Sequence, residues 1–199
     1  MMADIMLFIL HNFFLNIIYM IDIHDDVFTC STKMRNDIID FCKDKEPMSM
    51  LEIGTHRGYT NKYLAPYFTK ITGTENLQVH IDYFKDHNQA PNTEILNFDV
   101  YAENWNKLPD VDVVFIDCVH SYDGCKSDVD NSLKRYPDLK YIIFDDYEVW
   151  QGVNDVVTEY VQKDIFKVER LIGLDTIIGG HPSKDGTKGK QEGIIVSLK

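Results

Sequence analysis

The sequence predicts one α/β domain whose open, doubly wound sheet is mostly parallel, with helices on both faces and an antiparallel last strand. Three observations lead to this prediction. Short apolar stretches alternate with amphipathic, helix-like stretches from residue 31 to the C-terminus. The first of these apolar stretches runs into a glycine-containing turn at residues 54–58. Each of the first five apolar stretches ends in one or two acidic residues, as expected where ligands gather at one edge of a parallel sheet.

Composition limits the function classes. A chain of 199 residues is long enough for one complete core, and 44% hydrophobic with 26% charged residues is ordinary for a globular protein. The formal net charge of −12 argues against binding a nucleic-acid backbone, which requires clustered Lys and Arg, and favours a small-molecule partner. The four cysteines form no C-x-x-C pair, so reduced thiols and a cytoplasmic location are the simpler expectation.

Residues 1–30 form an apolar N-terminal segment, and residues 31–199 form the predicted domain. Between Ile5 and Ile21 the only polar residues are His11, Asn12 and Asn16, which fall on one narrow side of a helix. The segment lacks the charged start and cleavage site of a secretory signal and is short for a membrane span. A packing helix or a homo-oligomer interface is therefore favoured over a membrane-associated anchor. A non-native leader is a third alternative, because Met20 could equally begin the chain.

The elements are assigned from hydrophobic periodicity and from turn residues. Seven strands are expected, at residues 48–53, 70–74, 94–98, 111–116, 141–144, 166–171 and 193–198. Helices are expected at residues 31–46, with Ser31 as N-cap, and at 60–68, 80–87, 102–108, 121–135 and 152–163. A polar, glycine-rich loop at 180–193 joins the last two strands. Alternation of this kind predicts a Rossmann-like, seven-stranded sheet.

The stretch at residues 50–60, MLEIGTHRGYT, carries the most specific local signal. A buried strand ends at Glu52, the chain turns tightly at Gly54, and Gly58 allows close backbone approach where the next helix begins. Helix N-termini with unpaired N–H groups suit polar or anionic ligand groups. His56 occupies the position where a dinucleotide-binding G-x-G-x-x-G motif has its second glycine, which weakens an NAD-binding reading.

Acidic residues follow five consecutive predicted strands: Glu52, Glu75, Asp99, Asp117 and the pair Asp145-Asp146. Because parallel strands end at one edge of the sheet, these carboxylates should converge there. Glu75 lies 21 residues beyond Gly54, a spacing that suits an acid accepting hydrogen bonds from ribose hydroxyls. Asp117, Asp145 and Asp146 would repel one another strongly unless a divalent cation such as Mg²⁺ were bound between them. These three residues are therefore the predicted metal ligands.

The pattern Glu-x-Gly-x-x-x-Gly-Tyr-Thr resembles the cofactor loop of class I S-adenosylmethionine-dependent methyltransferases, most closely the catechol O-methyltransferase-like group. The Asp-Asp pair makes the chain similar to bacterial O-methyltransferases and cephalosporin-hydroxylase-like proteins. The resemblance implies S-adenosylmethionine as cofactor and Asp99 beside the adenine amino group. It also implies that Asp117 bridges the cofactor and the metal. The implied cofactor-binding residues are Glu52, Gly54, Thr55, Gly58, Tyr59, Thr60, Glu75, Asp99 and Asp117.

His120 stands three residues after Asp117, where catechol-type enzymes carry a lysine base. The sequence Asp-x-x-His-Ser-Tyr matches related sugar and natural-product methyltransferases. An imidazole is a sensible base for a metal-activated hydroxyl, so His120 and Asp117 are the candidate catalytic residues; orienting Asp117 is the alternative role of His120. Tyr122, Tyr147 and Trp150 could line the acceptor site or serve as packing.

The resulting expectation is a Mg²⁺-assisted O-methyltransferase that moves the methyl group of S-adenosylmethionine to a hydroxyl oxygen of a small molecule of sugar or natural-product type. Two alternatives remain at this point. One is a catalytically silent cofactor-binding or assembly protein of the same fold. The other, less favoured, is an NAD-binding Rossmann enzyme, which Glu75 permits and His56 opposes.

Overall fold

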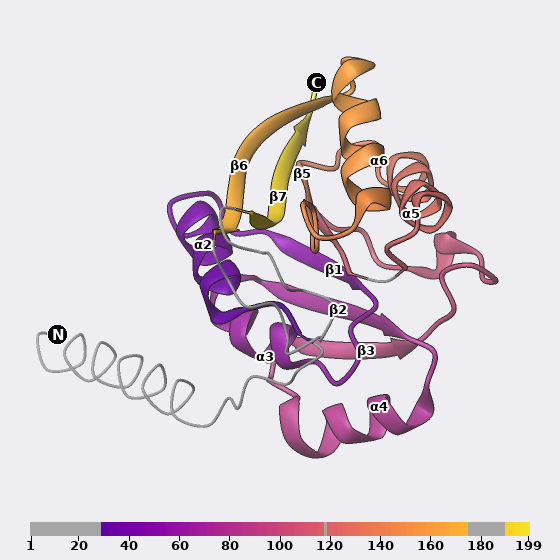
Figure 1. The fold of residues 1–199 in the computed structure, drawn as a ribbon. Helices are drawn as coiled ribbons and strands as arrows, with labels where there is room; N and C mark the ends of the chain where they lie inside the picture. Colours follow the sequence, from indigo (N-terminus) through magenta and orange to yellow (C-terminus); the bar gives the residue numbers. More distant parts are fainter. Residues whose placement is uncertain (1–28, 118, 175–189) are drawn as a thin grey trace, which may run out of the picture.

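The computed structural model describes residues 29–117, 119–174 and 190–199. These residues form a seven-stranded sheet in the order β3-β2-β1-β4-β5-β7-β6 (Figure 1). The strand pairs along β3-β2-β1-β4-β5 are all parallel, whereas β7 runs antiparallel to both β5 and β6. The predicted class, strand number and antiparallel last strand are confirmed.

The strands are β1 (Ser49–Ile53), β2 (Lys70–Glu75), β3 (Thr93–Asn97), β4 (Val113–Ile116), β5 (Tyr141–Phe144), β6 (Phe166–Leu174) and β7 (Gln191–Leu198). The α-helices of the described part are α2 (Thr32–Cys42), α3 (Tyr59–Leu64), α4 (Gln78–Tyr83), α5 (Tyr122–Arg135) and α6 (Gln151–Gln162). Short 3₁₀ turns follow at Ala65–Tyr67 and Trp105–Lys107, and a wider π turn extends α4 over Phe84–Asn88.

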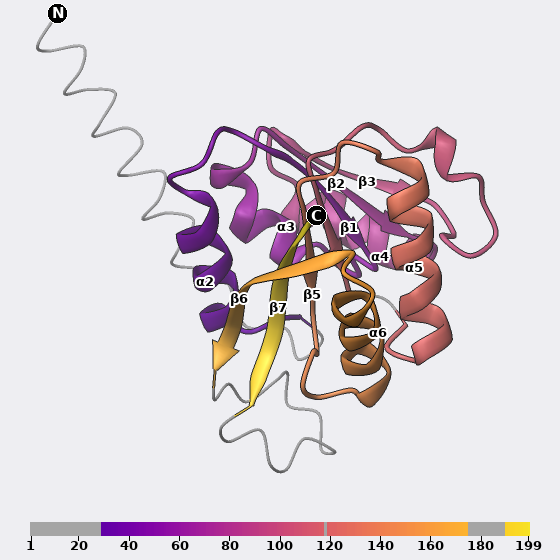
Figure 2. The ribbon, with the colours of Figure 1, turned by 90° about the horizontal axis from the view of Figure 1, so that it is seen from above.

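Helices cover both faces of the sheet, with α2 and α3 on one side and α5 and α6 on the other (Figure 2). Side chains alternate along each strand, so every central strand contributes to two cores. The core beneath α2 holds Met34 and Ile38 with Met50, Phe115 and Ile143, all at most 1% exposed. The core beneath α5 and α6 is built from the intervening strand positions. Its members include Leu51, Ile53, Val114, Ile116, Ile142, Phe144, Cys125, Val129, Val153, Val156 and Val157.

Two serines begin helices as the sequence patterns indicate. The hydroxyl of Ser31 accepts a hydrogen bond from the Met34 amide, and that of Ser121 accepts one from the Gly124 amide. Helix α5 also carries basic residues in its last turn, where they complement the negative end of the helix dipole. The N-cap predicted at Ser31 is thus confirmed.

Three of the predicted helices are shorter than expected. The helix predicted over 31–46 ends at Cys42. The helix predicted over 60–68 ends at Leu64 and continues as the 3₁₀ turn Ala65–Tyr67, because Pro66 has no N–H to donate to a carbonyl one turn earlier; the chain is extended at Phe68. The helix predicted over 102–108 is only the turn Trp105–Lys107, capped by the Asn104 side chain. Residues 99–104 form turns instead of a helix: the Asp99 side chain accepts the Tyr101 amide, and the Asp99 carbonyl accepts the amides of residues 102 and 103.

The apolar segment at residues 5–21 and most of the loop at 180–193 lie outside the described residues, as does Cys118. The three described cysteines, Cys30, Cys42 and Cys125, are free and buried. Within the described ranges, no helix has both the length and the hydropathy that crossing a membrane requires.

Candidate functional site

Strand register brings the predicted metal-binding acids together. Asp117 continues β4 and Asp145 continues β5, as shown by the ladder bonds from the Asp117 amide to Ile53 O (3.0 Å) and from the Asp145 amide to Ile116 O (3.1 Å). The paired residues Phe115 and Ile143 lie two positions earlier on neighbouring strands. Asp117 and Asp145 are therefore adjacent and point to the α2 side of the sheet, as does Glu52 at the end of β1.

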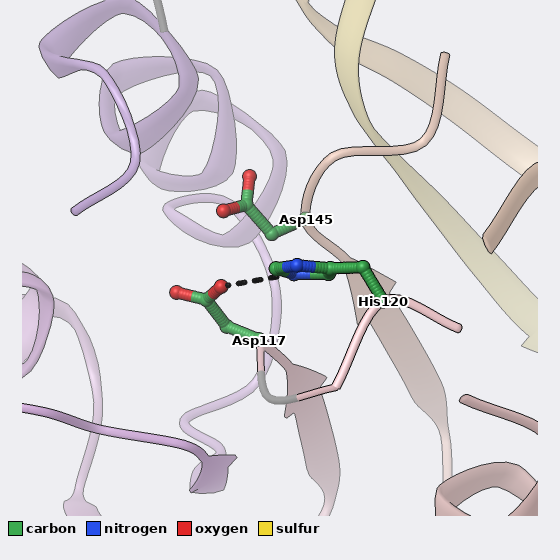
Figure 3. A group of neighbouring side chains, drawn as sticks. All are labelled: Asp117, His120 and Asp145. Atoms are coloured by element: carbon green, nitrogen blue, oxygen red, sulfur yellow. Dashed lines mark ion pairs between the residues drawn. The ribbon is translucent and has the colours of Figure 1, made fainter. Parts of the chain in front are cut away.

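His120 completes a compact group with two of these acids (Figure 3). One ligand atom from each of Asp117, His120 and Asp145 lies within 4.8 Å of the others, an arrangement that could hold a metal ion. Nε2 of His120 lies 3.5 Å from Oδ1 of Asp117. The group contains His120 where the sequence predicted Asp146. Asp146 is not a member of this group, and its predicted role as a metal ligand stays a prediction.

The backbone explains the position of Asp146. Its φ of 57° is left-handed, so the chain turns sharply at the end of β5 before α6 begins. Its carbonyl accepts the Val149 and Trp150 amides. The carboxylate is buried, and its Oδ2 lies 3.6 Å from Nδ1 of His120, on the ring edge opposite Asp117. Asp146 is placed to hold the imidazole.

Burial and mutual repulsion raise the pKa values of these acids. Burial first, and then the charges of Glu52 and Asp146, raises the pKa of Asp117. The pKa of Asp145 is likewise raised by burial and by the charge of Asp117. Burial raises the pKa of Glu52 to about 8. Among the described atoms, Oε2 of Glu52 and Oδ1 of Asp145 are buried without a hydrogen-bond partner. The site therefore holds more buried carboxylates than the described residues neutralise.

The glycine loop forms the tight turn that the sequence predicts. Gly54 has φ of 84°, and the amides of Gly54 and Thr55 both donate to the Thr74 carbonyl. The Thr55 hydroxyl donates to the Glu52 carbonyl at 3.2 Å. Gly58, with φ of 75°, precedes α3, and a Cβ there would lie 2.4 Å from the Phe84 ring. Gly58 is thus required by packing against Phe84; its predicted role in cofactor binding stays a prediction.

Two predicted loop residues make other contacts. The Thr60 hydroxyl is buried beside Thr29 Oγ1 at 2.8 Å and Cys30 Sγ at 3.4 Å, so the start of α3 is tied to the chain preceding α2. The hydroxyl of Tyr59 lies 2.7 Å from that of Tyr83. The structure therefore ties Thr60 to the chain before α2 and directs Tyr59 toward Tyr83 of α4, and the predicted cofactor roles of both residues stay predictions.

A pocket at the ends of β1, β2 and β3 contains both predicted nucleoside acids. Its lining residues are Gly54, Thr74, Glu75, Asn76, Phe98, Asp99, Val100 and Tyr101. Glu75 Oε1 accepts the amides of Asn76 and Leu77, while Oε2 lies 3.5 Å from Nδ1 of His80. The His80 ring in turn contacts His56. The predicted ribose and adenine residues are therefore neighbours on one concave surface.

Two site residues were missed by sequence reasoning. Glu192 on β7 is 1% exposed and accepts hydrogen bonds from the Ser31 amide at 2.7 Å and the Ser31 hydroxyl. Its charge contributes to the raised pKa of Asp145 and Asp117, though less than burial does. The sequence signal for Glu192 was a single acid directly before the apolar run of the last strand. Tyr101, which lines the pocket that contains Glu75 and Asp99, had none, because exposed tyrosines are common in loops.

Comparison with solved structures identifies the fold. An O-methyltransferase from Bacillus cereus bound to SAH superposes with a TM-score of 0.63 at 16% identity, over 86% of this chain and 83% of that one. The tomaymycin-synthesis O-methyltransferase of Streptomyces achromogenes, bound to SAM, gives 0.62 at 14%, over 86% and 82%. A SAH-bound methyltransferase from Podospora anserina gives 0.58 at 15%, over 83% and 77%.

Other similar structures act on different acceptors. One is an N-methyltransferase from Bradyrhizobium japonicum, with a TM-score of 0.55 at 12% identity, over 82% of this chain and 92% of that one. The fold alone therefore leaves the acceptor atom open. No protein-family model and no curated protein sequence matches this chain. On strand order, antiparallel last strand and these superpositions, the chain has the fold of the class I S-adenosylmethionine-dependent methyltransferases.

Proposed function

We propose that this chain is an S-adenosylmethionine-dependent O-methyltransferase that acts on a hydroxyl group of a small molecule with the help of a divalent cation, Mg²⁺ first. The observation that carries the proposal is the Asp117–His120–Asp145 group, built at the carboxyl ends of β4 and β5 beside the glycine loop. It provides an oxygen-rich ligand set and an imidazole within one small volume.

The carboxylates of this site fit both the divalent cation and S-adenosylmethionine. Two buried carboxylate atoms, Glu52 Oε2 and Asp145 Oδ1, have no described hydrogen-bond partner, and repulsion contributes to the raised pKa of the neighbouring acids. A cation relieves that repulsion, and carboxylate oxygens are the ligands that Mg²⁺ prefers. The positively charged sulfonium of S-adenosylmethionine is likewise favoured beside excess negative charge. The pocket at the ends of β1, β2 and β3, which we call the nucleoside pocket, offers Glu75 and Asp99 as acceptors for the ribose hydroxyls and the adenine amino group.

The residues of the chain take distinct roles. Glu75 and Asp99 bind the nucleoside, and the Gly54 turn admits it. Asp117 and Asp145 would hold the cation, whose Lewis acidity would lower the pKa of an acceptor hydroxyl. Asp146 faces Nδ1 of His120 and thereby leaves Nε2 toward Asp117. That nitrogen accepts the hydroxyl proton. Positioning the acceptor oxygen in line with the activated methyl group supplies much of the rate enhancement.

The testing experiment is a thermal-shift titration with S-adenosylmethionine, S-adenosylhomocysteine and NAD, each with and without Mg²⁺. A ligand at a hundredfold excess over Kd adds about 2.7 kcal/mol of stability. For a chain of this size we expect a rise of about 5–10 °C with either adenosyl ligand and none with NAD. A response to NAD alone would contradict the proposal. Binding without methyl transfer to any hydroxylated acceptor would favour a catalytically silent binding protein.

His120 can be tested separately as proton acceptor or metal ligand. If Nε2 accepts the proton, His120→Ala abolishes turnover and leaves Mg²⁺ affinity, measured calorimetrically, within about twofold of wild type. If Nε2 binds the cation, the same variant loses about ten- to a hundredfold in affinity. Asp145→Asn is the matched comparison, because it removes a carboxylate ligand at the same site and should weaken Mg²⁺ binding in either case.

A further inference from the structure

We propose that Tyr101 is a binding residue of the nucleoside pocket and that Asp128, a buried acid on α5, positions it through a hydrogen bond. The inference rests on the proposed function, because it assigns the wall of the pocket that would receive the adenosyl part of the cofactor. No comparison and no sequence pattern points to either residue.

Tyr101 lines the pocket and lies on a turn whose backbone is fixed by neighbouring contacts. The Asp99 side chain accepts the Tyr101 amide at 2.9 Å, and the Trp105 indole donates to the Val100 carbonyl at 2.9 Å. Val100 and Trp105 are buried in the core, whereas Tyr101 is 47% exposed and lines the pocket. The backbone on this side of the pocket is therefore fixed by these contacts.

Asp128 sets the orientation of the Tyr101 ring. The Tyr101 hydroxyl donates to Oδ2 of Asp128 at 3.1 Å, a contact that joins the turn after β3 to the middle of α5. Tyr101 is thus fixed at two points: its backbone amide donates to Asp99, and its hydroxyl donates to Asp128. A tyrosine fixed in this way loses less conformational freedom when a flat base packs against it.

The burial of Asp128 is unusual for a residue that only supports the helix. It is 0% exposed on the face of α5 that also buries Cys125, Val129 and Ser132, positions where an apolar side chain would fit the pattern. Its Oδ1 has no hydrogen-bond partner among the described residues. Burial raises its pKa to about 7, even though the Tyr101 hydroxyl and the charge of His120 act in the other direction. A buried acid that is hydrogen-bonded to a residue lining the pocket indicates a functional role.

The experiment measures calorimetric affinities for S-adenosylhomocysteine and for adenosine. Tyr101→Phe keeps the ring and removes the hydroxyl, and Asp128→Ala removes the acceptor; each should raise both Kd values about three- to tenfold. Asp128→Asn keeps an acceptor oxygen and should restore affinity to within about twofold. The double variant Tyr101→Phe/Asp128→Ala should bind no more weakly than either single variant, because both remove the same contact.

Tyr63→Phe is the matched control. It also removes one tyrosine hydrogen bond, to Asn36 Oδ1 at 2.8 Å, at a position outside the pocket, so its affinity should equal that of wild type. Melting temperatures measured alongside separate the two roles: a merely structural Asp128 would change the melting temperature and leave Kd unchanged. Wild-type affinity in Tyr101→Phe, or additive losses in the double variant, would overturn this inference alone. Failure of the wild-type protein to bind either nucleoside would overturn the proposed function as well.

Discussion

The imidazole of His120 stacks on the indole of Trp150, with ring centroids 5.9 Å apart and 14° between the ring planes. Trp150 is 42% exposed and immediately precedes α6, so the stack joins the loop after β4 to the turn after β5. His120 is therefore held on one face by Trp150 and along its edges by Asp117 and Asp146.

This stack makes Trp150 an optical reporter of the site. The chain has two tryptophans, so the emission lost in Trp150→Phe belongs to Trp150. We expect Mg²⁺ to change that component, because a cation at Asp117 and Asp145 alters the charge around the stacked ring. The change should disappear in His120→Ala. An identical Mg²⁺ response in wild type, Trp150→Phe and His120→Ala would show that the emission change arises elsewhere.

Gly152 should resist substitution by alanine. In most helices this change stabilises by about 0.5–1 kcal/mol. Here a Cβ would lie 2.4 Å from the Tyr122 amide nitrogen and 2.6 Å from the His120 carbonyl oxygen, both backbone atoms. We expect Gly152→Ala to lower the free energy of unfolding by about 1–3 kcal/mol in urea titrations and to weaken the Mg²⁺ response. Gln151→Ala, an exposed neighbour, should stay within about 0.5 kcal/mol of wild type. A stabilised Gly152→Ala would contradict the contact.

Asp145→Asn should stabilise the metal-free protein. The substitution keeps the shape of a buried side chain and removes its repulsion with Asp117, so we expect the free energy of unfolding to rise by about 1 kcal/mol without Mg²⁺. The stabilisation by added Mg²⁺ should be lost.

Asp112→Asn is the control for this variant. It lies at the opposite edge of the sheet, where its carboxylate accepts the Ser49 amide at 2.8 Å and pairs with Lys140 at 2.8 Å. This variant should be less stable and keep the Mg²⁺ response. A destabilised Asp145→Asn that still responds to Mg²⁺ would exclude the metal site.

Stability of the ligand-free protein should fall as pH rises between about 4 and 8. Burial raises the pKa of Glu52 from 4.5 to about 8 and that of Asp128 from 3.8 to about 7. In this interval the unfolded chain loses these protons before the folded protein does, so stability present at low pH is lost as pH passes the folded pKa values. Each group contributes on the order of 4–5 kcal/mol.

Urea unfolding at pH 5 and pH 8 measures this effect. Glu52→Gln and Asp128→Asn should each flatten the pH dependence, because the amides carry no titrating proton. Asp86→Asn changes an exposed carboxylate on the turn after α4 and should leave the slope unchanged. A protein that is equally stable at both pH values, with or without these substitutions, would show that neither acid is protonated in the fold.

Sequence alone was sufficient for the sheet because its signals are local. The apolar run at residues 111–116, the glycine turn at Gly54 and the helix cap at Ser31 each act within a few residues, and the structure confirms a strand, a turn and a cap at these places. Acids at successive strand ends also predicted convergence, because parallel strands share one edge. The length of the helices after Leu64 and near Ala102 was less predictable, because Pro66 and the Asp99 turn compete with helical periodicity.

The tertiary structure decided which side chains meet. The left-handed backbone at Asp146 places its carboxylate beside Nδ1 of His120, and the loop after β4 brings His120 to Asp117 and Asp145. Glu192, Trp150 and the Tyr101–Asp128 pair enter the site from segments far apart in the chain. The physical reason is that alternation and turn chemistry determine local direction. Which distant groups share a buried volume depends on helix packing across the sheet, which no local pattern encodes.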